Sequence, residues 1–420
     1  MRVLYWFRND LRLTDNRGLT MAIEKASEVI PVYIFDERLF QTRLGVPRIG
    51  SQRLRFLLES ITDLQNSLRQ LHSDLIVLVG DPAVLIPKLA AEVGASEVFC
   101  SLAQGSEEKQ SLQMVQRRIP VTEITDGYLL DPSLLPFSIA ELPDVFTQFR
   151  IKVEKQLSIQ KPLPRIEKIN TPKVSKCDVP DFSLFAMSMP EPHPHRIDDF
   201  LGGEQEGLNR LNYYCSSPER IGRYKETRNG LIGEYSSRFS PWLAIGAISA
   251  RSIMQEVKDY EEKYGANDSS YWMFFELLWR DYFRFVYDKY GVLIFQSGGL
   301  KDKPTGSRDV RKFQSWCSGQ TTCDFVNANM IELSKTGWMS NRGRQNVASF
   351  LVHDLGVDWR LGAAWFEYLL VDYDVASNYG NWLYLAGLGN DPRPNRRFNT
   401  ALQQAQYDPN GEYTRLWTTP

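Results

Sequence analysis

The first 126 residues alternate between short apolar runs rich in β-branched side chains and longer amphipathic segments. This alternation is typical of a parallel sheet, because each parallel connection must cross back over the sheet and usually does so as a helix. The predicted strands cover residues 3–7, 29–35, 75–79, 97–100 and 121–124, and the predicted helices cover residues 17–26, 51–71, 82–93 and 107–117. We therefore predict an α/β fold with a five-stranded parallel sheet at the N-terminus.

Periodicity and capping support the helix predictions. Leu54, Leu58 and Ile61 recur at intervals of four and three residues, and Asp81 before Pro82 is a typical helix start. No G-x-G-x-x-G follows the first strand, and no G-x-x-x-x-G-K-[ST] occurs in the chain. The sequence therefore supports neither a Rossmann dehydrogenase nor a P-loop nucleotidase.

A proline-rich stretch divides the chain. Seven prolines lie between residues 158 and 194 among scattered polar residues, which is typical of a linker over a surface. Beyond it, residues 202–391 show helical periodicity without clear strands. We predict an α/β domain over residues 1–130, an interdomain linker over residues 131–200 and an all-helical domain over residues 201–420.

The charge and cysteine content restrict the partners of the chain. Lys+Arg 49 against Asp+Glu 51 give a net charge of −2, so affinity for a polyanion must come from a local basic face. Five cysteines and four histidines in 420 residues predict no disulfide framework and no metal cluster, in a reducing compartment. The longest charge-free apolar stretch falls well short of the roughly 20 residues that span a bilayer. We expect a cytoplasmic monomer without metal or membrane partner.

Aromatic residues concentrate in the predicted helical domain. Only nine of the 51 lie in residues 1–130, whereas residues 271–295 alone hold eleven. Such density is equally typical of a wide core stripe on a buried helix. Charges among the aromatics favour a binding site, and three segments of the helical domain carry them.

The first segment, residues 224–240, groups serines around Arg238 before an apolar run, which suits a phosphate at a helix start or a simple cap. In the second, residues 275–285, Glu276, Trp279, Arg280 and Phe283 share one helix face. The alternative there is a surface Glu276–Arg280 pair above a core stripe.

The third segment, residues 336–391, is rich in tryptophan, leucine and valine and also carries charges. Buried charges need partners or a ligand. We therefore expect Arg342 and Arg344 to meet Asp372 and Asp374 inside.

The chain resembles the photolyase/cryptochrome family of flavoproteins, and most of all its cryptochrome-DASH branch. The resemblance rests on WFRNDLRLTDN, YKETRNG, YSSRFSPWLA, FELLWRDYFRF, TGWMSNRGRQNVASF and YDVASNYGNW, which occur in the family's order. It implies a helical domain that holds FAD in a folded conformation, in which the cofactor performs the chemistry. The implied cofactor-binding residues are Tyr224, Ser236, Ser237, Arg238, Phe239, Ser240, Glu276, Arg280, Asn341, Arg344, Asp372, Asp374 and Asn378.

The resemblance also implies the substrate, a cyclobutane pyrimidine dimer flipped out of DNA, which costs less in a single strand. An arginine-rich rim would bind the backbone, although residues 393–397 also suit a solvated charge run. The implied substrate-binding residues are Glu276, Trp279, Asn341, Arg342, Gln345, Tyr384, Arg393, Arg396 and Arg397. The implied catalytic residues are Glu276, Trp279, Asn378 and Tyr384, with Trp382 and Trp359 as electron relays.

Two departures from the family pattern bear on function. The third relay tryptophan is expected ten residues before Trp316, where this chain has Gly306. The family's folate antenna is held by a carboxylate after the fourth strand, where this chain has Ser101-Leu102-Ala103, so a bound methenyltetrahydrofolate is not expected.

Two function classes fit the chain. The first is light-driven repair of pyrimidine dimers, mainly in single-stranded DNA. The alternative is a blue-light receptor that binds FAD and DNA without significant repair. A third interpretation, an unrelated α/β enzyme with a helical cap, does not explain the number and order of the motifs.

Overall fold

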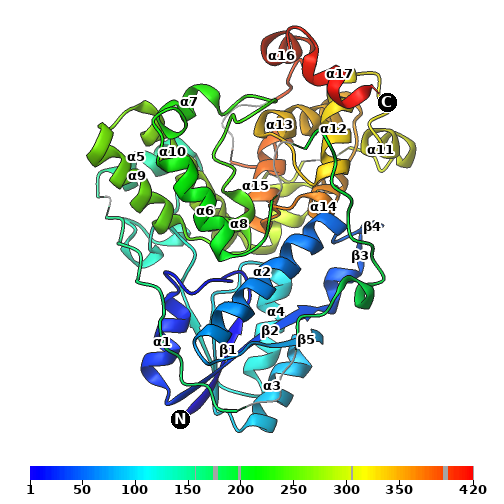
Figure 1. Ribbon diagram of the computed structural model, residues 1–420. Coiled ribbons are helices and arrows are strands. Elements are labelled where there is room, and N and C mark those ends of the chain that lie inside the picture. Colours follow the sequence, from blue (N-terminus) through cyan, green and yellow to red (C-terminus); the bar gives the residue numbers. More distant parts are fainter. Residues whose placement is uncertain (157, 174–177, 197–199, 304–305, 391–395, 420) are drawn as a thin grey trace.

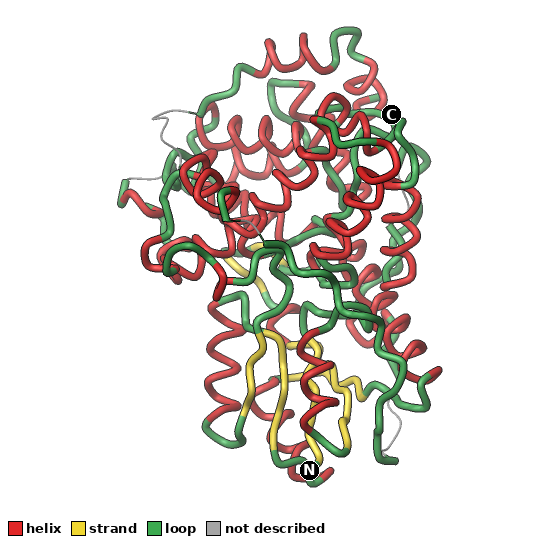
Figure 2. The backbone as a smooth tube through the Cα atoms, turned by 90° about the vertical axis from the view of Figure 1, so that its left-hand side faces the viewer, coloured by secondary structure: helices red, strands yellow, loops and turns green. Residues whose placement is uncertain are grey.

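The computed structural model describes residues 1–156, 158–173, 178–196, 200–303, 306–390 and 396–419. It consists of a sheet-containing part at the N-terminus and a larger helical part (Figure 1). The strands gather at one end of the molecule in the perpendicular view as well (Figure 2). Both predicted parts, the parallel α/β fold and the helical fold, are confirmed.

Five parallel strands form the sheet, in the order β5-β2-β1-β6-β7. Each predicted strand and helix is present, with ends shifted by no more than one residue. The strands are β1 (Arg2–Phe7), β2 (Glu28–Asp36), β5 (Ile76–Gly80), β6 (Glu97–Ser101) and β7 (Val121–Ile124). The helices between them are α1 (Arg17–Lys25), α2 (Ser51–Gln70), α3 (Pro82–Val93) and α4 (Ser106–Gln116).

Helices cover both faces of the sheet. Tyr5 and Phe7 of β1 belong to a buried cluster that includes Ile61 of α2, whereas Leu4 belongs to a cluster that includes Leu89 of α3. Successive strand residues point to opposite faces, so burial on both faces requires the continuous apolar strands that the sequence shows.

A two-stranded antiparallel ribbon, β3 (Thr42–Arg43) with β4 (Val46–Pro47), was not predicted. Leu44 and Gly45 both have positive φ, 53° and 79°, as a tight hairpin turn requires. Two-residue strands are too short to leave a periodic signal in the sequence.

Helices are the main regular elements in the rest of the described chain, and α10 is the longest of them. They are α5 (Phe146–Glu154), α6 (Glu204–Cys215), α7 (Tyr224–Thr227), α8 (Ser240–Ala244), α9 (Ala250–Tyr264), α10 (Asp268–Tyr290), α11 (Val310–Cys317), α12 (Asp324–Thr336), α13 (Asn341–Ser349), α14 (Trp359–Leu369), α15 (Val375–Leu385), α16 (Thr400–Tyr407) and α17 (Glu412–Thr418). A π-helical turn, Phe350–Asp354, extends α13. No described helix combines the length and apolar character that crossing a membrane requires.

The proline-rich segment runs back over the sheet. The amide of Val29 donates to the carbonyl of Asn170 at 2.9 Å, and Ile166 and Ile169 are buried in the same cluster as Tyr5. Helix α5, which lies in the predicted linker, packs against α10. The exact domain boundaries stay a prediction.

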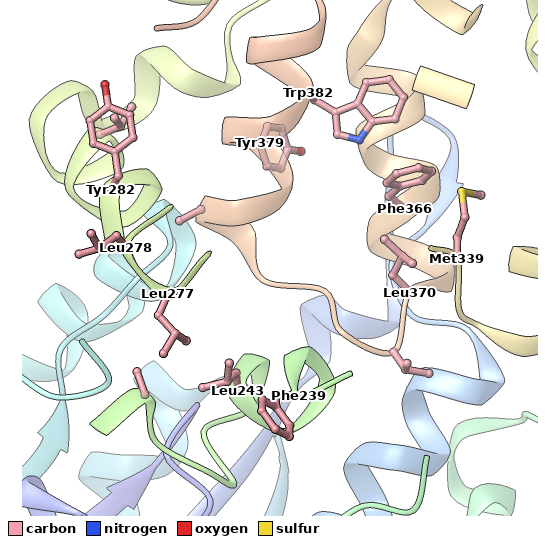
Figure 3. Close-up of a cluster of buried hydrophobic side chains, with 14 of the residues drawn as sticks. Phe239, Leu243, Leu277, Leu278, Tyr282, Met339, Phe366, Leu370, Tyr379 and Trp382 are labelled. Carbon is pink, nitrogen blue, oxygen red and sulfur yellow. The ribbon is translucent and has the colours of Figure 1, made fainter. Parts of the chain in front are cut away.

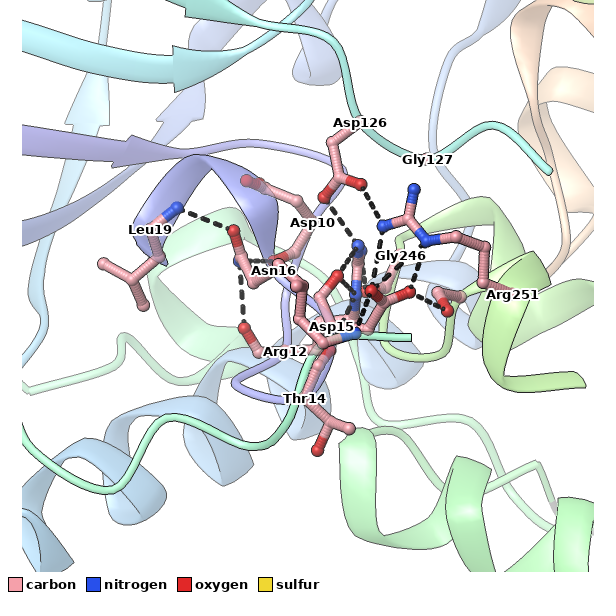
Figure 4. Close-up of polar contacts among 12 residues, drawn as sticks. Asp10, Arg12, Thr14, Asp15, Asn16, Leu19, Asp126, Gly127, Gly246 and Arg251 are labelled. Atoms are coloured by element: carbon pink, nitrogen blue, oxygen red, sulfur yellow. Dashed lines mark hydrogen bonds and ion pairs between the residues drawn. The ribbon is translucent and has the colours of Figure 1, made fainter. Parts of the chain in front are cut away.

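A buried network of charges joins the two parts (Figure 4). Asp126 accepts from Arg12 at 2.6 Å and from Arg251 at 3.0 Å, and Arg251 also pairs with Asp15 at 2.9 Å. Ser249 donates to Asp15 at 2.5 Å. Arg12, Asp15 and Asp126 belong to the N-terminal part, whereas Ser249 and Arg251 begin α9, so we call this network the interdomain clasp.

Candidate cofactor and substrate site

A cavity of about 100 Å³ opens between α13, α14 and α15. Apolar side chains from α8, α10, α14 and α15 lie around the same region (Figure 3). Seven residues that the sequence analysis singled out line the cavity: Asn341, Arg344, Gln345, Asp372, Asp374, Asn378 and Trp382. The fold therefore brings these seven residues together from α13, α15 and the loop before α15.

An ion pair stands at the centre of this lining. Arg344 contacts Asp372 at 2.9 Å, and Ser240 at the start of α8 donates to the same carboxylate oxygen at 2.7 Å. The other oxygen, Oδ1 of Asp372, is buried without a hydrogen-bond partner among the described residues. A buried acceptor left open in this way costs free energy unless a ligand satisfies it. The predicted pairing of Arg344 with Asp372 is present.

Asp374 does not pair with Arg342, contrary to the expectation from the sequence. Its carboxylate caps α15 by accepting from the amide of Ser377 at 2.8 Å and contacts Arg284 at 3.3 Å. Burial raises the pKa of Asp374, but Arg284 and Arg280 outweigh it and hold the pKa below its usual range. Asp374 is therefore an ionised cap that fixes the start of α15.

Asn378 lies one turn further along α15. Its side-chain amide donates to the carbonyl of Ala363 at 3.1 Å, which ties α15 to α14 and leaves the amide oxygen as an acceptor. Trp382 follows at i+4 on the same face. Its indole nitrogen is buried without a hydrogen-bond partner among the described residues.

The serine-rich segment before α8 is strongly bent. Arg238 has φ of 55°, a left-handed conformation that only special contexts hold in place. Arg210 supports the bend by donating to the carbonyls of Ser236 at 3.0 Å and Ser237 at 2.8 Å. Tyr224 is buried beside it, within hydrogen-bond reach of Ser237. Phe239, the residue before α8, is buried against Tyr214 of α6.

Glu276 of α10 pairs with Arg228 at 2.7 Å. Burial raises the pKa of Glu276, and the Arg228 charge opposes this rise. Arg280 donates instead to the carbonyl of Gly127 at 2.7 Å, so the alternative of a Glu276–Arg280 surface pair is wrong. Arg280, predicted as a cofactor-binding residue, points toward the N-terminal part and does not line the cavity, unlike Arg344, Asp372 and Asp374.

Trp279 and Tyr384 form an aromatic pair between α10 and α15. Their ring centroids are 5.8 Å apart in an edge-to-face arrangement, and both side chains are half-buried. Phe146 of α5 stacks on Trp279 at 3.7 Å, and the Arg396 guanidinium lies 3.9 Å from the Tyr384 ring. Rings and a cation arranged in this way suit the stacking of a nucleobase.

The remaining predicted residues lie apart from the aromatic pair. Arg342 donates to Asn229 at 3.0 Å and to Gln345 at 2.9 Å. Arg397 is exposed and pairs with Asp354 at 2.6 Å. Trp359 is buried at the start of α14, and Arg393 lies outside the described residues.

Comparisons with known proteins identify this arrangement. Residues 3–168 match the DNA photolyase family, and residues 272–419 match the FAD binding domain of DNA photolyase. A cryptochrome DASH of Gloeobacter violaceus is 46% identical over 99% of this chain and 85% of the relative, and one of Danio rerio is 46% identical over 99% and 82%. The crystal structure of a Synechocystis sp. PCC6803 cryptochrome matches with a TM-score of 0.95 and 44% identity, over 99% of this chain and 88% of that one. The chain belongs to the cryptochrome-DASH family.

FAD is the cofactor of this cryptochrome-DASH domain, and the cavity suits a flavin ring. The open Asp372 oxygen would accept a ring N–H, Arg344 and Asn378 would offer further polar contacts, and Phe366 and Trp382 supply apolar walls. The bent segment before α8 is joined to the cavity lining through the hydrogen bond from Ser240 to Asp372. The residues present therefore fit FAD.

The second cleft of this cryptochrome-DASH chain, about 180 Å³, lies between the two parts. Its carboxylates already have partners: Glu107 pairs with Arg43 and Arg48, and Glu367 pairs with the same two arginines. Glu108 accepts from the amides of residues 104 and 105. Each of these three carboxylates therefore already has a protein partner, and a folate antenna in this cleft stays doubtful, as the sequence indicates.

Sequence reasoning missed several members of the site. Arg228 lies within the quoted YKETRNG motif, but its partner Glu276 is 48 residues away and no local spacing links them. Phe146 belongs to the predicted linker, so nothing indicated its stack on Trp279. Ser377 and Asn381 flank Asn378 on one face of α15, and helical spacing would have found them.

Proposed function

We propose that this protein uses FAD and blue light to split cyclobutane pyrimidine dimers, preferentially in single-stranded DNA. The observation that carries the proposal is the pairing of Trp279 with Tyr384, on the helix that also lines the flavin cavity. The flipped dimer presents two ring faces inclined to each other, and an edge-to-face aromatic pair is suited to contact both.

The chain's own residues bind and orient the lesion. Trp279 and Tyr384 stack on its rings, and Glu276 contacts a pyrimidine edge. Asn341 and Gln345 line the space between lesion and cofactor, and Asn378 orients the flavin. A reduced flavin bound in the cavity would supply one electron on excitation and recover it after the two C–C bonds between the pyrimidines break. The backbone contacts are assigned to Arg342, Arg393, Arg396 and Arg397.

The preference for single strands has an energetic reason. Unpairing and unstacking cost a few kcal/mol in a duplex and less in a single strand. A chain with a net charge of −2 has little bulk attraction for DNA with which to offset that cost.

One feature favours the alternative, a photoreceptor that binds DNA without repair. Phe146 covers one face of Trp279, and Arg396 covers the ring of Tyr384. A lesion must displace these contacts before it can stack. If the displacement costs more than the stacking contributes, the site senses light without turning over a lesion.

We further propose that the protein works as a cytoplasmic monomer. The described cysteines Cys100, Cys215, Cys317 and Cys323 are free thiols, as expected in a reducing compartment.

The test is repair of a thymine dimer in matched single- and double-stranded oligonucleotides, by protein whose flavin has been chemically reduced. Repair in blue light and not in darkness, faster in the single strand, is the expected result. Bound flavin without repair of either substrate would favour the photoreceptor. Equal repair of both substrates would contradict the single-strand preference alone.

A further inference from the structure

Trp382 connects the flavin cavity to a row of aromatic rings. It lines the cavity, and its ring lies 5.1 Å from Phe366 and 6.3 Å from Trp316. Trp316 has no exposed surface, and its indole donates to the carbonyl of Val347 at 3.0 Å, which holds the ring in place. An oxidisable ring therefore stands directly behind the cavity wall.

The row continues to the surface. Phe313 lies 6.1 Å from Trp316 and 6.2 Å from Trp365, and Trp365 lies 5.3 Å from Tyr368. Both Trp365 and Tyr368 are half-buried, whereas Trp316 is fully buried. The rings thus connect the interior of the helical part to side chains that touch solvent.

Trp359, the second relay predicted from the sequence, has no comparable exit. It is 1% exposed. Its ring neighbour Tyr379, at 5.9 Å, is 3% exposed, and the Tyr379 hydroxyl accepts from Arg43 at 3.3 Å. Oxidation of a tyrosine releases its proton, and a guanidinium cannot take it.

The family's third relay tryptophan is expected at position 306, and the backbone there has no room for a side chain. Gly306 precedes Ser307, whose backbone pairs with Val357. A Cβ on Gly306 would lie 2.4 Å from the carbonyl oxygen of Gly356, so this backbone leaves no room for a side chain. A radical at Trp359 would therefore find no aromatic side chain at position 306 through which to reach the surface.

We propose that photoreduction of the flavin in this protein draws its electron through Trp316 and Trp365, not through Trp359. The route rests on the proposed placement of the flavin ring beside Trp382. Trp382 gives one electron to the excited oxidised cofactor. Trp316 then reduces the Trp382 radical, and Trp365 reduces the Trp316 radical across Phe313. The radical ends on Trp365, or on Tyr368 with loss of its phenolic proton to water. A thiol reductant in solution then reduces it.

Flavin photoreduction tests the route. Oxidised holoprotein with excess dithiothreitol is illuminated with blue light without oxygen, and loss of the oxidised flavin absorbance is followed. The variants are Trp316→Phe, Trp365→Phe and Trp359→Phe, with Trp417→Phe as a matched control in a buried tryptophan outside the row. Flavin-to-protein ratio and melting temperature confirm that each variant is folded and loaded, and transient absorption reports the tryptophan radical.

We expect Trp316→Phe and Trp365→Phe to slow photoreduction by about tenfold or more, and Trp359→Phe to slow it less than either. A larger loss in Trp359→Phe than in Trp316→Phe would overturn the route, as would wild-type rates in Trp316→Phe. If Trp316→Phe fails to fold, the same ranking between Trp365→Phe and Trp359→Phe decides. Wild-type protein that binds no flavin would overturn the proposed function together with the route, whereas ranked losses in loaded variants concern the route alone.

Discussion

The interdomain clasp and the flavin cavity are both built from buried arginines and aspartates, but they differ in completeness. In the clasp, both oxygens of Asp126 accept from an arginine, and both oxygens of Asp15 accept from Arg251. In the cavity, Asp372 receives Arg344 and Ser240 on one oxygen, and its other oxygen has no partner among the described residues.

This difference indicates that the clasp stabilises the fold, whereas the cavity network binds a ligand. A fully satisfied network stabilises one arrangement of the two parts and offers nothing to a ligand. Arg12 and Arg251 accordingly hold the pKa of Asp126 below its usual range, although burial alone would raise it. A network with an open acceptor is incomplete until a ligand arrives, so the free energy of completing it becomes binding free energy.

The largest expected effect follows from breaking the clasp. Asp126→Ala leaves Arg12 and Arg251 without their shared carboxylate, which should cost about 3–5 kcal/mol of unfolding free energy. Denaturant unfolding measures the loss. The control is Glu92→Ala, which removes an exposed pair with Lys88 and should change stability by no more than about 0.5 kcal/mol. A loss in Asp126→Ala no larger than in the control would contradict the structural role.

Breaking the cavity network should change binding more than folding. Asp372→Ala removes the open acceptor and the partner of Arg344, and bound flavin should fall to about a tenth of the wild-type content or less. The flavin-free variant should lose only about 1–2 kcal/mol of stability. Absorbance of the purified protein gives the flavin content, and Asp354→Ala, which frees exposed Arg397, is the control. Full flavin retention in Asp372→Ala would refute the pairing.

A third substitution leaves both networks intact and tests the aromatic pair alone. Trp279→Ala should keep the flavin and weaken binding of a dimer-containing single strand by about 1–3 kcal/mol, because one stacking surface is lost. Glu276→Ala should likewise spare the flavin and weaken lesion binding or repair. Fluorescence anisotropy measures affinity, and Tyr271→Ala on the exposed side of α10 is the control. Unchanged affinity and repair would remove both residues from the site.

A gradual, pH-dependent effect concerns Glu332, a buried carboxyl group that belongs to neither network. Burial raises the pKa of Glu332 to about 8, against the Tyr413 hydrogen bond and the charges of Arg238 and Arg344, which lower it. Folded protein keeps this proton where unfolded chain has released it, so stability is full below the unfolded pKa and falls as pH rises toward about 8.

Denaturant unfolding across that pH range tests whether Glu332 is protonated in the folded protein. The loss should approach ~1.4 kcal/mol per pH unit, and Glu332→Gln should remove most of it. Glu412→Gln, an exposed change at the start of α17, serves as the control. An equal slope in wild type and Glu332→Gln would show that Glu332 is ionised throughout.

Local pattern predicted most of the fold and part of the site. Runs of β-branched residues identified all five strands, because strand and helix periods follow from the backbone of each segment alone. The pair of Arg344 with Asp372 was predictable, since two charges in an otherwise apolar segment must find each other. The same reasoning was wrong for Arg342 and Asp374, which face Asn229 and Arg284 instead.

The sequence by itself therefore determined the elements, their order and the residue types available for a flavin and a base. Tertiary structure alone decided the partners: Arg228 for Glu276, Phe146 for Trp279 and Trp316 for Trp382. The physical reason is that periodicity is a property of neighbours in the chain, whereas a contact depends on how distant helices pack. The closed position at Gly306 and the open oxygen of Asp372 arise only from that packing.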